Sequence, residues 1–365
     1  MKHIHLIAAA RPNFMKIAPL YHALSKESWC RPAIVHTGQH YDPNMSDAFF
    51  RDLAMPKPHF HLEIGSGTHA EQTGGVMIAY EKVAMTEKPD WIVVVGDVNS
   101  TAACAMVGAK LWIPVVHLEA GLRSRDRRMP EEINRLVTDA IADVLWTPSR
   151  DGDENLLREG VPAERIECIG NIMIDSYEMM RGAIEADATR AGLGLEAGGY
   201  GVVTLHRPSN VDTRAALAPL VDGLLEVARR VPLVFAVHPR TRKKLEEFGL
   251  MPRLAGERAI RVVDPLGYIQ FMNLVTGARV VITDSGGVQE ETTYLGIPCL
   301  TLRENTERPV TVTEGSNRLV QPGALVAQVD SVLAHPGRLG HVPELWDGKA
   351  ASRAVASLKR RSGVG

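Results

Sequence analysis

Short apolar runs alternate with amphipathic segments along the chain. The runs have the length of buried strands, and the segments between them have the three- to four-residue spacing of helices. Five strands are predicted in the first part of the chain, at residues 3–10, 32–38, 91–97, 113–121 and 143–149. Five more are predicted at residues 200–207, 233–240, 259–264, 279–287 and 299–304. Helical patterns lie between strands, as at residues 14–26 and 101–111.

This alternation predicts an α/β protein with two doubly wound parallel sheets that have helices on both faces. The order of elements starts again after residue 170, so domains are expected at 1–170 and 171–349. A last helix at 350–361 is expected to pack back on the first domain. Ligands of open sheets bind beyond the carboxyl ends of the strands. Two such edges that face each other would form an interdomain cleft.

Composition narrows the class of protein further. The chain has 365 residues, a formal net charge of -2 and a pI of about 6.7, which argues against nucleic-acid and anionic-membrane partners. It starts directly with an apolar strand, and no apolar run has the length of a membrane span. The four cysteines are widely spaced and form no CxxC pair. These features predict a reduced, cytoplasmic protein.

Three carboxylates follow predicted strands of the first domain. Asp97 ends one strand, Glu119 lies at the end of another, and Glu131 comes after Pro130, a typical first residue of a helix. Acids beside buried strands are costly unless they are paired or used, so these three are candidates for proton transfer. Glu132 is instead attributed to the helix N-terminus, whose dipole favours acids.

A strand, a Ser-Gly-Gly turn and a helix occupy residues 280–298. Backbone N–H groups of Ser285, Gly286 and Gly287 at the start of the helix would suit a diphosphate. Glu290 and Glu291 are expected in its first turn, where the helix dipole accounts for one of them. Glu291 is therefore assigned to ribose hydroxyls. The motif is neither a Walker A loop nor a GxGxxG fingerprint, so ATP and NAD are not favoured.

Cationic side chains and histidines also stand at strand ends. Arg308 could grip a diphosphate or form a surface ion pair. Arg11 and Lys16 flank the first strand–helix turn and suggest an anionic ligand. His206 ends a strand and could donate to a phosphate or transfer protons, and His238 has a similar but weaker setting.

Two pairs of histidines have the spacing of metal ligands. They are His3 with His5, and His59 with His61. Neither pair is accompanied by a third ligand at a suitable spacing, so no metal site is predicted.

Taken together, the motifs resemble those of the non-hydrolysing UDP-N-acetylglucosamine 2-epimerases. The matching segments follow in order over nearly the whole chain: RPNFMKIAPL, TGQHYD, GDVNST, HLEAGLRS, PEEINR, TLHR, HPR, TDSGGVQEE and TERP. The resemblance implies two Rossmann-like domains of the glycosyltransferase-B kind and a UDP-N-acetyl sugar as substrate. It also implies a homodimer and no metal or nicotinamide cofactor.

The resemblance also assigns roles to residues. It implies a catalytic neighbourhood of Arg11, Lys16, Asp97, Glu119, Glu131 and His206. It implies that UDP is held by Ser285, Gly286, Glu291 and Arg308, with Phe271 near the base. The sequence departs from the family at Asn13, at Pro208-Ser209 and at residues 41–43, which leaves open both allosteric activation by a second UDP-sugar and the exact acetamido sugar.

The expected chemistry is an elimination followed by an addition. Departure of UDP from C1 makes the C2 proton acidic, a carboxylate removes that proton, and a 2-acetamidoglucal remains. Proton return on the opposite face and re-addition of UDP give the C2 epimer. Four alternatives stay open: an epimerase of a modified UDP-acetamido sugar, a hydrolysing epimerase, a glycosyltransferase-B-type transferase and a non-catalytic UDP-sugar sensor.

Overall fold

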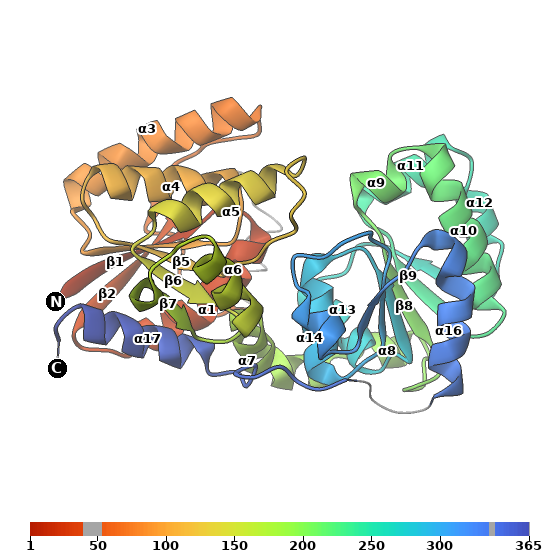
Figure 1. The fold of residues 1–365 in the computed structure, drawn as a ribbon. Coiled ribbons are helices and arrows are strands. Elements are labelled where there is room, and N and C mark those ends of the chain that lie inside the picture. Colours follow the sequence, from red (N-terminus) through yellow and green to blue (C-terminus); the bar gives the residue numbers. More distant parts are fainter. Residues whose placement is uncertain (39–52, 336–339, 365) are drawn as a thin grey trace. The chain divides into compact units, whose positions relative to one another are not determined.

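The chain folds into two compact units (Figure 1). The computed structural model describes residues 1–38, 53–335 and 340–364, and the side chain of Arg11 lies outside this description. Unit 1 contains Met1–Met179 and Glu344–Gly365, and unit 2 contains Met180–Pro343. In the described ranges, no helix is both long and apolar enough to cross a membrane.

Unit 1 is built on a parallel sheet. Within the described residues its strands follow the order β3-β2-β1-β4-β5-β6-β7. Their bounds are β1 Lys2–Ala8, β2 Cys30–His36, β3 Phe60–His61, β4 Trp91–Val95, β5 Val115–Leu118, β6 Val144–Thr147 and β7 Ile166–Cys168. β4, β5 and β6 are buried along their whole length, as expected for apolar strands covered on both faces. The strand order changes direction between β1 and β4, which is where open sheets of this type bind ligands.

Helices cover both faces of this sheet (Figure 1). They are α1 Arg11–Leu24, α3 His69–Glu87, α4 Asn99–Lys110, α5 Pro130–Ile141, α6 Arg150–Arg158, η1 Ala163–Arg165, α7 Ile172–Ala186 and α17 Ala350–Arg361. The C-terminal α17 packs against α1. Its first N–H groups, at Ala350 and Ala351, donate to the buried carboxylate of Asp175 on α7 over 3.1 and 2.8 Å. One side chain therefore caps α17 and joins it to α7.

Unit 2 repeats the architecture. Within the described residues its parallel strands follow the order β10-β9-β8-β11-β12-β13. Their bounds are β8 Gly201–Thr204, β9 Leu233–Ala236, β10 Ile260–Val263, β11 Val280–Thr283, β12 Cys299–Thr301 and β13 Asn317–Leu319. The helices are α8 Thr189–Gly192, α9 Pro208–Val211, α10 Arg214–Ala228, α11 Pro239–Glu247, α12 Met251–Ala255, α13 Tyr268–Thr276, α14 Gly286–Leu295, α15 Val310–Thr313, η2 Pro322–Ala324 and α16 Leu325–Ala334. Here the strand order changes direction between β8 and β11.

The predicted fold class, two doubly wound Rossmann-like units, is confirmed. Each of the ten predicted strands overlaps an observed strand. Eight observed strands lie inside the predicted ranges, whereas β1 and β2 begin one and two residues before them. The short strands β3, β7 and β13 were missed, since two or three residues show no periodicity. The predicted helix at 350–361 coincides with α17.

Replacing Asp175 with alanine is expected to destabilise unit 1 by about 1–2 kcal/mol, because α17 loses its N-terminal cap. Burial raises the pKa of Asp175 to about 6, against the opposing effect of the Ala351 and Ala350 N–H groups, so the cap is ionised at neutral pH. Urea unfolding and hydrogen exchange of the first α17 amides measure the effect. Glu167 is the control, because it pairs with Arg360 and Arg361 at the other, more exposed end of α17. Glu167→Gln should cost less than about 1 kcal/mol, and equal losses would contradict the capping role.

Candidate active site

A buried ion pair lies at the switch point of unit 1. Lys16 on α1 pairs with Glu119, which follows β5, and the two residues are only 9% and 4% exposed. Gly96, after β4, faces this pair: a Cβ there would lie 3.5 Å from both charged groups and 3.6 Å from Asn13 Nδ2. The structure thus brings Lys16 and Glu119 together. Arg11 begins α1 in the same region, but its side chain is not described.

Glu119 has two features that set it apart from a structural acid. Its φ of +71° lies in the left-handed region, which is unusual for a residue other than glycine and concentrates at functional sites. Its Oε2 pairs with Lys16, whereas its buried Oε1 has no hydrogen-bond partner among the described residues. A buried carboxylate oxygen without a partner is costly unless a ligand uses it.

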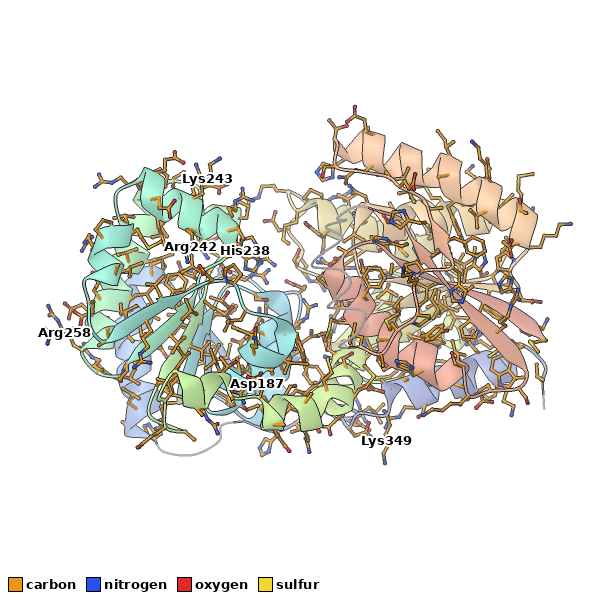
Figure 2. The ribbon with its side chains drawn as sticks, turned by 180° about the vertical axis from the view of Figure 1, so that it is seen from behind. Asp187, His238, Arg242, Lys243, Arg258 and Lys349 are labelled. Carbon is orange, nitrogen blue, oxygen red and sulfur yellow. The ribbon has the colours of Figure 1, made fainter. Side chains whose placement is uncertain are left out.

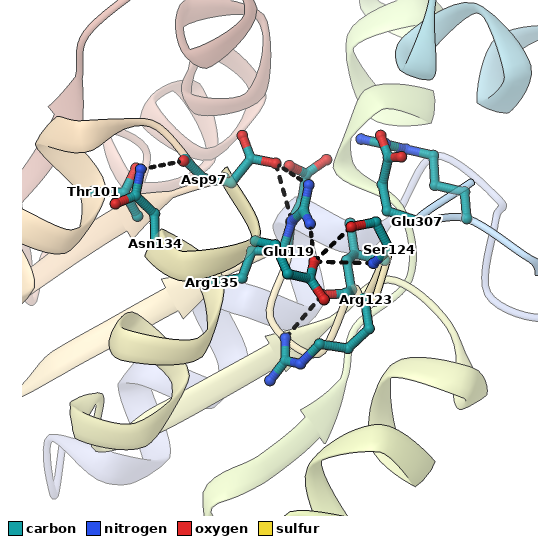
Figure 3. Close-up of polar contacts among 12 residues, drawn as sticks. Asp97, Thr101, Glu119, Arg123, Ser124, Asn134, Arg135 and Glu307 are labelled. Atoms are coloured by element: carbon teal, nitrogen blue, oxygen red, sulfur yellow. Dashed lines mark hydrogen bonds and ion pairs between the residues drawn. The ribbon is translucent and has the colours of Figure 1, made fainter. Parts of the chain in front are cut away.

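Asp97 directly follows Gly96, the residue that faces this pair, but its side chain has a different partner (Figure 3). Its Oδ2 accepts hydrogen bonds from Arg135 Nη2 at 2.8 Å and Nε at 3.1 Å. Asn134 donates to the backbone oxygen of Asp97 at 2.9 Å. Both partners come from α5, so this helix fixes the turn that carries Asp97.

The two glutamates at the start of α5 have opposite environments. Glu132 is 2% exposed and pairs with Arg135. It also accepts hydrogen bonds from Ser124 N at 2.9 Å, Ser124 Oγ at 3.0 Å and Arg125 N at 2.9 Å. Glu132 lies in the first turn of α5, as predicted, and these contacts give it a structural role in addition to the helix dipole. Glu131 is exposed, and within the described residues it makes no hydrogen bond or ion pair, so its catalytic role stays a prediction.

His206 is held by a buried aspartate of unit 2. Asp284, after β11, is fully buried, and its Oδ1 lies 3.0 Å from His206 Nδ1. The backbone N–H groups of His206 and Arg207 also donate to this carboxylate, at 3.0 and 2.9 Å. Burial would raise the pKa of Asp284, but its hydrogen bonds, led by that of His206, bring the pKa below its usual value. The ionised aspartate fixes the ring orientation and leaves Nε2 for a ligand. Sequence reasoning missed Asp284 as a functional residue.

His238 lies near His206, with 5.5 Å between the ring centroids. It stands at the N-terminal end of α11, where its Nδ1 accepts from Arg240 N at 3.2 Å, and Arg242 and Lys243 follow on the same helix (Figure 2). Burial, and then His206, lower its pKa. The structure therefore brings the two predicted histidines together at the end of the sheet.

The start of α14 has the geometry of an anion site. Ser285 precedes the helix, which begins at Gly286. A Cβ at Gly286 would lie 2.9 Å from Arg308 Nη1 and 2.8 Å from Glu307 Oε1, so a larger residue there would force both side-chain ends to shift. A Cβ at Gly287 would meet no atom within 4 Å. Backbone N–H groups and a guanidinium together suit a phosphate group.

Arg308 is a buried residue of this site. It is 7% exposed, and it pairs with Glu290 at 2.9 Å and with Glu307 at 2.5 Å. The alternative of a surface ion pair was therefore wrong. Glu307, which sequence reasoning missed, also binds Arg303 at 2.8 Å.

The two glutamates of α14 lie further into the helix than predicted. Because α14 begins at Gly286, Glu290 and Glu291 fall beyond its first turn, and the expected dipole pairing was wrong. Burial, and to a smaller extent Glu290, raise the pKa of Glu291 to about 8, against a hydrogen bond with Tyr268 of α13. Phe271 lies one turn after Tyr268 on that helix and is partly buried.

Among the described residues, neither of the two histidine pairs belongs to a group of side chains that could hold a metal ion. Within the described ranges, no group of three or more His, Cys, Asp or Glu side chains has a suitable arrangement for a metal ion. Most of the predicted TGQHYD motif lies in residues 39–52, outside the described residues.

The two Rossmann-like units and the strand-end groups define an α/β enzyme of the nucleotide-sugar class. A family model described as UDP-N-acetylglucosamine 2-epimerase matches residues 22–359. The chain belongs to this family. The predicted family and the predicted activity class, an epimerase, are confirmed.

Relatives within the family are named as epimerases of different UDP-sugars. The chain is 44% identical to the UDP-N-acetylglucosamine 2-epimerase of Methanocaldococcus jannaschii over 324 residues, which are 87% of this chain and 88% of that protein. It is 41% identical to the UDP-2,3-diacetamido-2,3-dideoxy-D-glucuronate 2-epimerase of Pseudomonas aeruginosa over 318 residues, 86% of this chain and 87% of that protein. A crystal structure of the M. jannaschii enzyme in complex with UDP-GlcNAc and UDP has a TM-score of 0.89 and 41% identity, covering 98% of this chain and 99% of that one.

The contrast between the two α5 glutamates predicts two different phenotypes. Glu131→Gln is expected to lower epimerase turnover by about 100-fold or more, the range for loss of an acid–base group, and to leave the Tm unchanged because Glu131 is exposed. Glu132→Gln is expected to destabilise the fold by about 3 kcal/mol, because it breaks a buried ion pair. Turnover and thermal unfolding of both variants test this. A stable, fully active Glu131→Gln variant would contradict the assignment of Glu131.

The pKa of Glu291 predicts a pH-dependent stability. Between its ordinary pKa of 4.5 and about 8 in the fold, the folded state holds a proton that the unfolded chain has lost. The contribution of Glu291 to stability therefore falls as pH rises across this window. Glu291→Gln should remove the loss and raise the Tm of the ligand-free protein near the upper limit, by an amount set by about 1.4 kcal/mol per unit of pKa difference. A gain equally large near the lower limit would contradict this.

Proposed function

We propose that this protein interconverts UDP-N-acetylglucosamine and UDP-N-acetylmannosamine by elimination and re-addition of UDP. The observation that carries the proposal is Glu119, a buried carboxylate in a left-handed backbone conformation, with one oxygen on Lys16 and the other unpartnered. Such a group suits proton transfer at a carbon centre. Family membership supports the same conclusion.

Unit 2 supplies the groups for the departing diphosphate in this proposal. Arg308 and the N–H groups at Ser285, Gly286 and Gly287 would bind UDP, and His206 would donate to the β-phosphate as the C1–O bond breaks. Glu291, predominantly protonated below a pH of about 8, would hold the ribose hydroxyls as a neutral carboxylic acid, with Phe271 near the base.

Unit 1 supplies the acid and base groups. One of Asp97, Glu119 and Glu131 would take the C2 proton of the sugar, which leaves 2-acetamidoglucal and UDP. Another would return a proton to the opposite face of C2, after which UDP adds again at C1. Lys16 would hold the side chain of Glu119 through their ion pair, and Arg135 would hold that of Asp97.

A modified acetamido sugar is the second candidate substrate. It is favoured by the similarity to the P. aeruginosa epimerase of a diacetamido glucuronate, which is close to the similarity to the M. jannaschii enzyme. The elimination step would be unchanged, because the added groups stand at C3 and C6 rather than at C1 or C2.

The quaternary state and the location belong to this proposal as well. A homodimer is supported by apolar side chains that stay exposed on unit 1, at Trp112 after α4 and at Ile78 and Met85 on α3. A cytoplasmic location is supported by the cysteines, which are free in the structure.

The proposal is tested by proton NMR of the purified protein with UDP-N-acetylglucosamine in deuterated water. The expected product is UDP-N-acetylmannosamine with deuterium at C2, because the returned proton comes from solvent. Free N-acetylmannosamine with UDP would mean a hydrolysing epimerase. Turnover of the diacetamido glucuronate analogue alone would favour the second substrate, and turnover of neither would overturn the epimerase assignment.

A further inference from the structure

A second buried aspartate of unit 1 contacts the chain on both sides of Glu119. Asp139 lies on α5 and is 1% exposed. Its Oδ1 is 2.5 Å from Nδ1 of His117, and its Oδ2 accepts the N–H of Gly121 at 3.1 Å. His117 and Gly121 stand two residues before and two residues after Glu119. One carboxylate therefore holds both flanks of the residue on which the proposed chemistry depends.

His117 extends this contact to the turn that carries Asp97. The imidazole is fully buried, and its Nε2 lies 2.8 Å from the carbonyl oxygen of Gly96. Gly96 has a φ of +68° and directly precedes Asp97. Both ring nitrogens of His117 thus face acceptor atoms, one on α5 and one on the loop after β4.

Arg123 keeps the aspartate charged in this position. Its Nη1 lies 2.7 Å from Asp139 Oδ2, and its Nε and Nη2 bind Glu159 at 2.9 and 2.6 Å. Burial would raise the pKa of Asp139, but His117 and Arg123 lower it below its usual value. Asp139 is therefore an ionised acceptor with a fixed set of donors.

The backbone of Glu119 needs such a set of contacts. A left-handed conformation costs a residue other than glycine roughly 1–3 kcal/mol and persists only where its surroundings enforce it. Lys16 holds the side chain of Glu119, but it does not constrain the backbone on either side. The contacts that do include the Asp139 bonds to His117 and Gly121. Three further bonds hold the same stretch: Ala120 N to Trp146 O at 3.0 Å, Gly96 N to Leu118 O at 3.0 Å, and Asn155 Nδ2 to Gly121 O at 2.9 Å.

We propose that Asp139 is a positioning residue of the epimerase reaction, which holds Glu119 in its left-handed conformation through His117 and Gly121. It touches no reacting atom and acts through Glu119 and the Gly96 turn. The inference rests on the proposed function, because it takes Glu119 as an acid–base group. The competing explanation is that the Asp139 cluster, formed by Asp139, His117 and Arg123, only stabilises the core.

Asp139→Asn is the first test, because the amide keeps the shape and cannot accept from all three donors. We expect turnover to fall about 10- to 100-fold, as for residues that orient a functional group. We expect the KM for UDP-N-acetylglucosamine and the affinity for UDP to stay unchanged. In a crystal structure of the variant, Glu119 should leave the left-handed region or lose Lys16. Unchanged turnover in a folded variant, or a loss of turnover with Glu119 unmoved, would overturn the inference.

Asp143→Asn is the matched control. Asp143 lies four residues after Asp139, just beyond the end of α5, and accepts the backbone N–H of Val115 over 2.8 Å, at the other end of β5 from Glu119. This variant should keep wild-type turnover. A loss as large as that of Asp139→Asn would assign the effect to the general stability of β5 and overturn the inference.

A double-mutant cycle separates this inference from the proposed function. Wild-type turnover tests the function, and Glu119→Gln tests the role of Glu119. In the Glu119→Gln background, Asp139→Asn should cause little further loss, because its effect passes through the missing carboxylate. An equal fold-loss in both backgrounds would overturn the inference. If Asp139→Asn does not fold, His117→Gln is measured by the same criteria, and failure of both to fold would assign the cluster to the core.

Discussion

Carboxylates that are buried at the carboxyl ends of parallel strands are the constraint on which the rest of this structure depends. An ionised acid in such a place is tolerated only with cationic or N–H partners. Glu119 has Lys16, Asp139 has His117 and Arg123, and Asp284 has His206. Each of these partners comes from a different element than its acid, so the charges fix how helices and strand-end loops meet. The functional groups are thereby held by the same interactions that complete the fold.

The architecture could be predicted from the sequence because every major strand is a buried apolar run between helical patterns. A parallel sheet imposes that pattern, since both of its faces are covered. β3, β7 and β13 could not be predicted, because they pair at sheet edges over two or three residues and carry no periodic signal. Their existence depends on neighbours distant in sequence.

The candidate site was predicted less completely, and the reasons lie in particular residues. Lys16 and Glu119 meet because they follow strands on the two sides of the switch point of unit 1. His206 and His238 meet because they follow the adjacent strands β8 and β9. Glu132 could have been recognised from Arg135, which stands three residues later on the same helix face. Asp139 and Asp284 gave no such signal, because their partners lie on other elements. Glu290 and Glu291 were misplaced by a turn, since the Ser-Gly-Gly sequence does not show where α14 begins.

Two of the buried acids of unit 2, Asp284 and Glu291, have pKa values shifted in opposite directions. Asp284 accepts N–H groups from His206, Arg207 and Asn210, and its pKa lies below the usual value. Glu291 has Tyr268 as a hydrogen-bond partner and Glu290 as a neighbour, and its pKa is raised to about 8. Burial raises the pKa of both acids, so the number and kind of hydrogen-bond donors decide which acid is ionised. When the environment lowers the pKa of one carboxyl group and raises that of another, the two groups can take different chemical roles. The ionised Asp284 orients His206. In the proposed function, the neutral Glu291 would donate to a ribose hydroxyl without repelling a diphosphate at the start of the same helix.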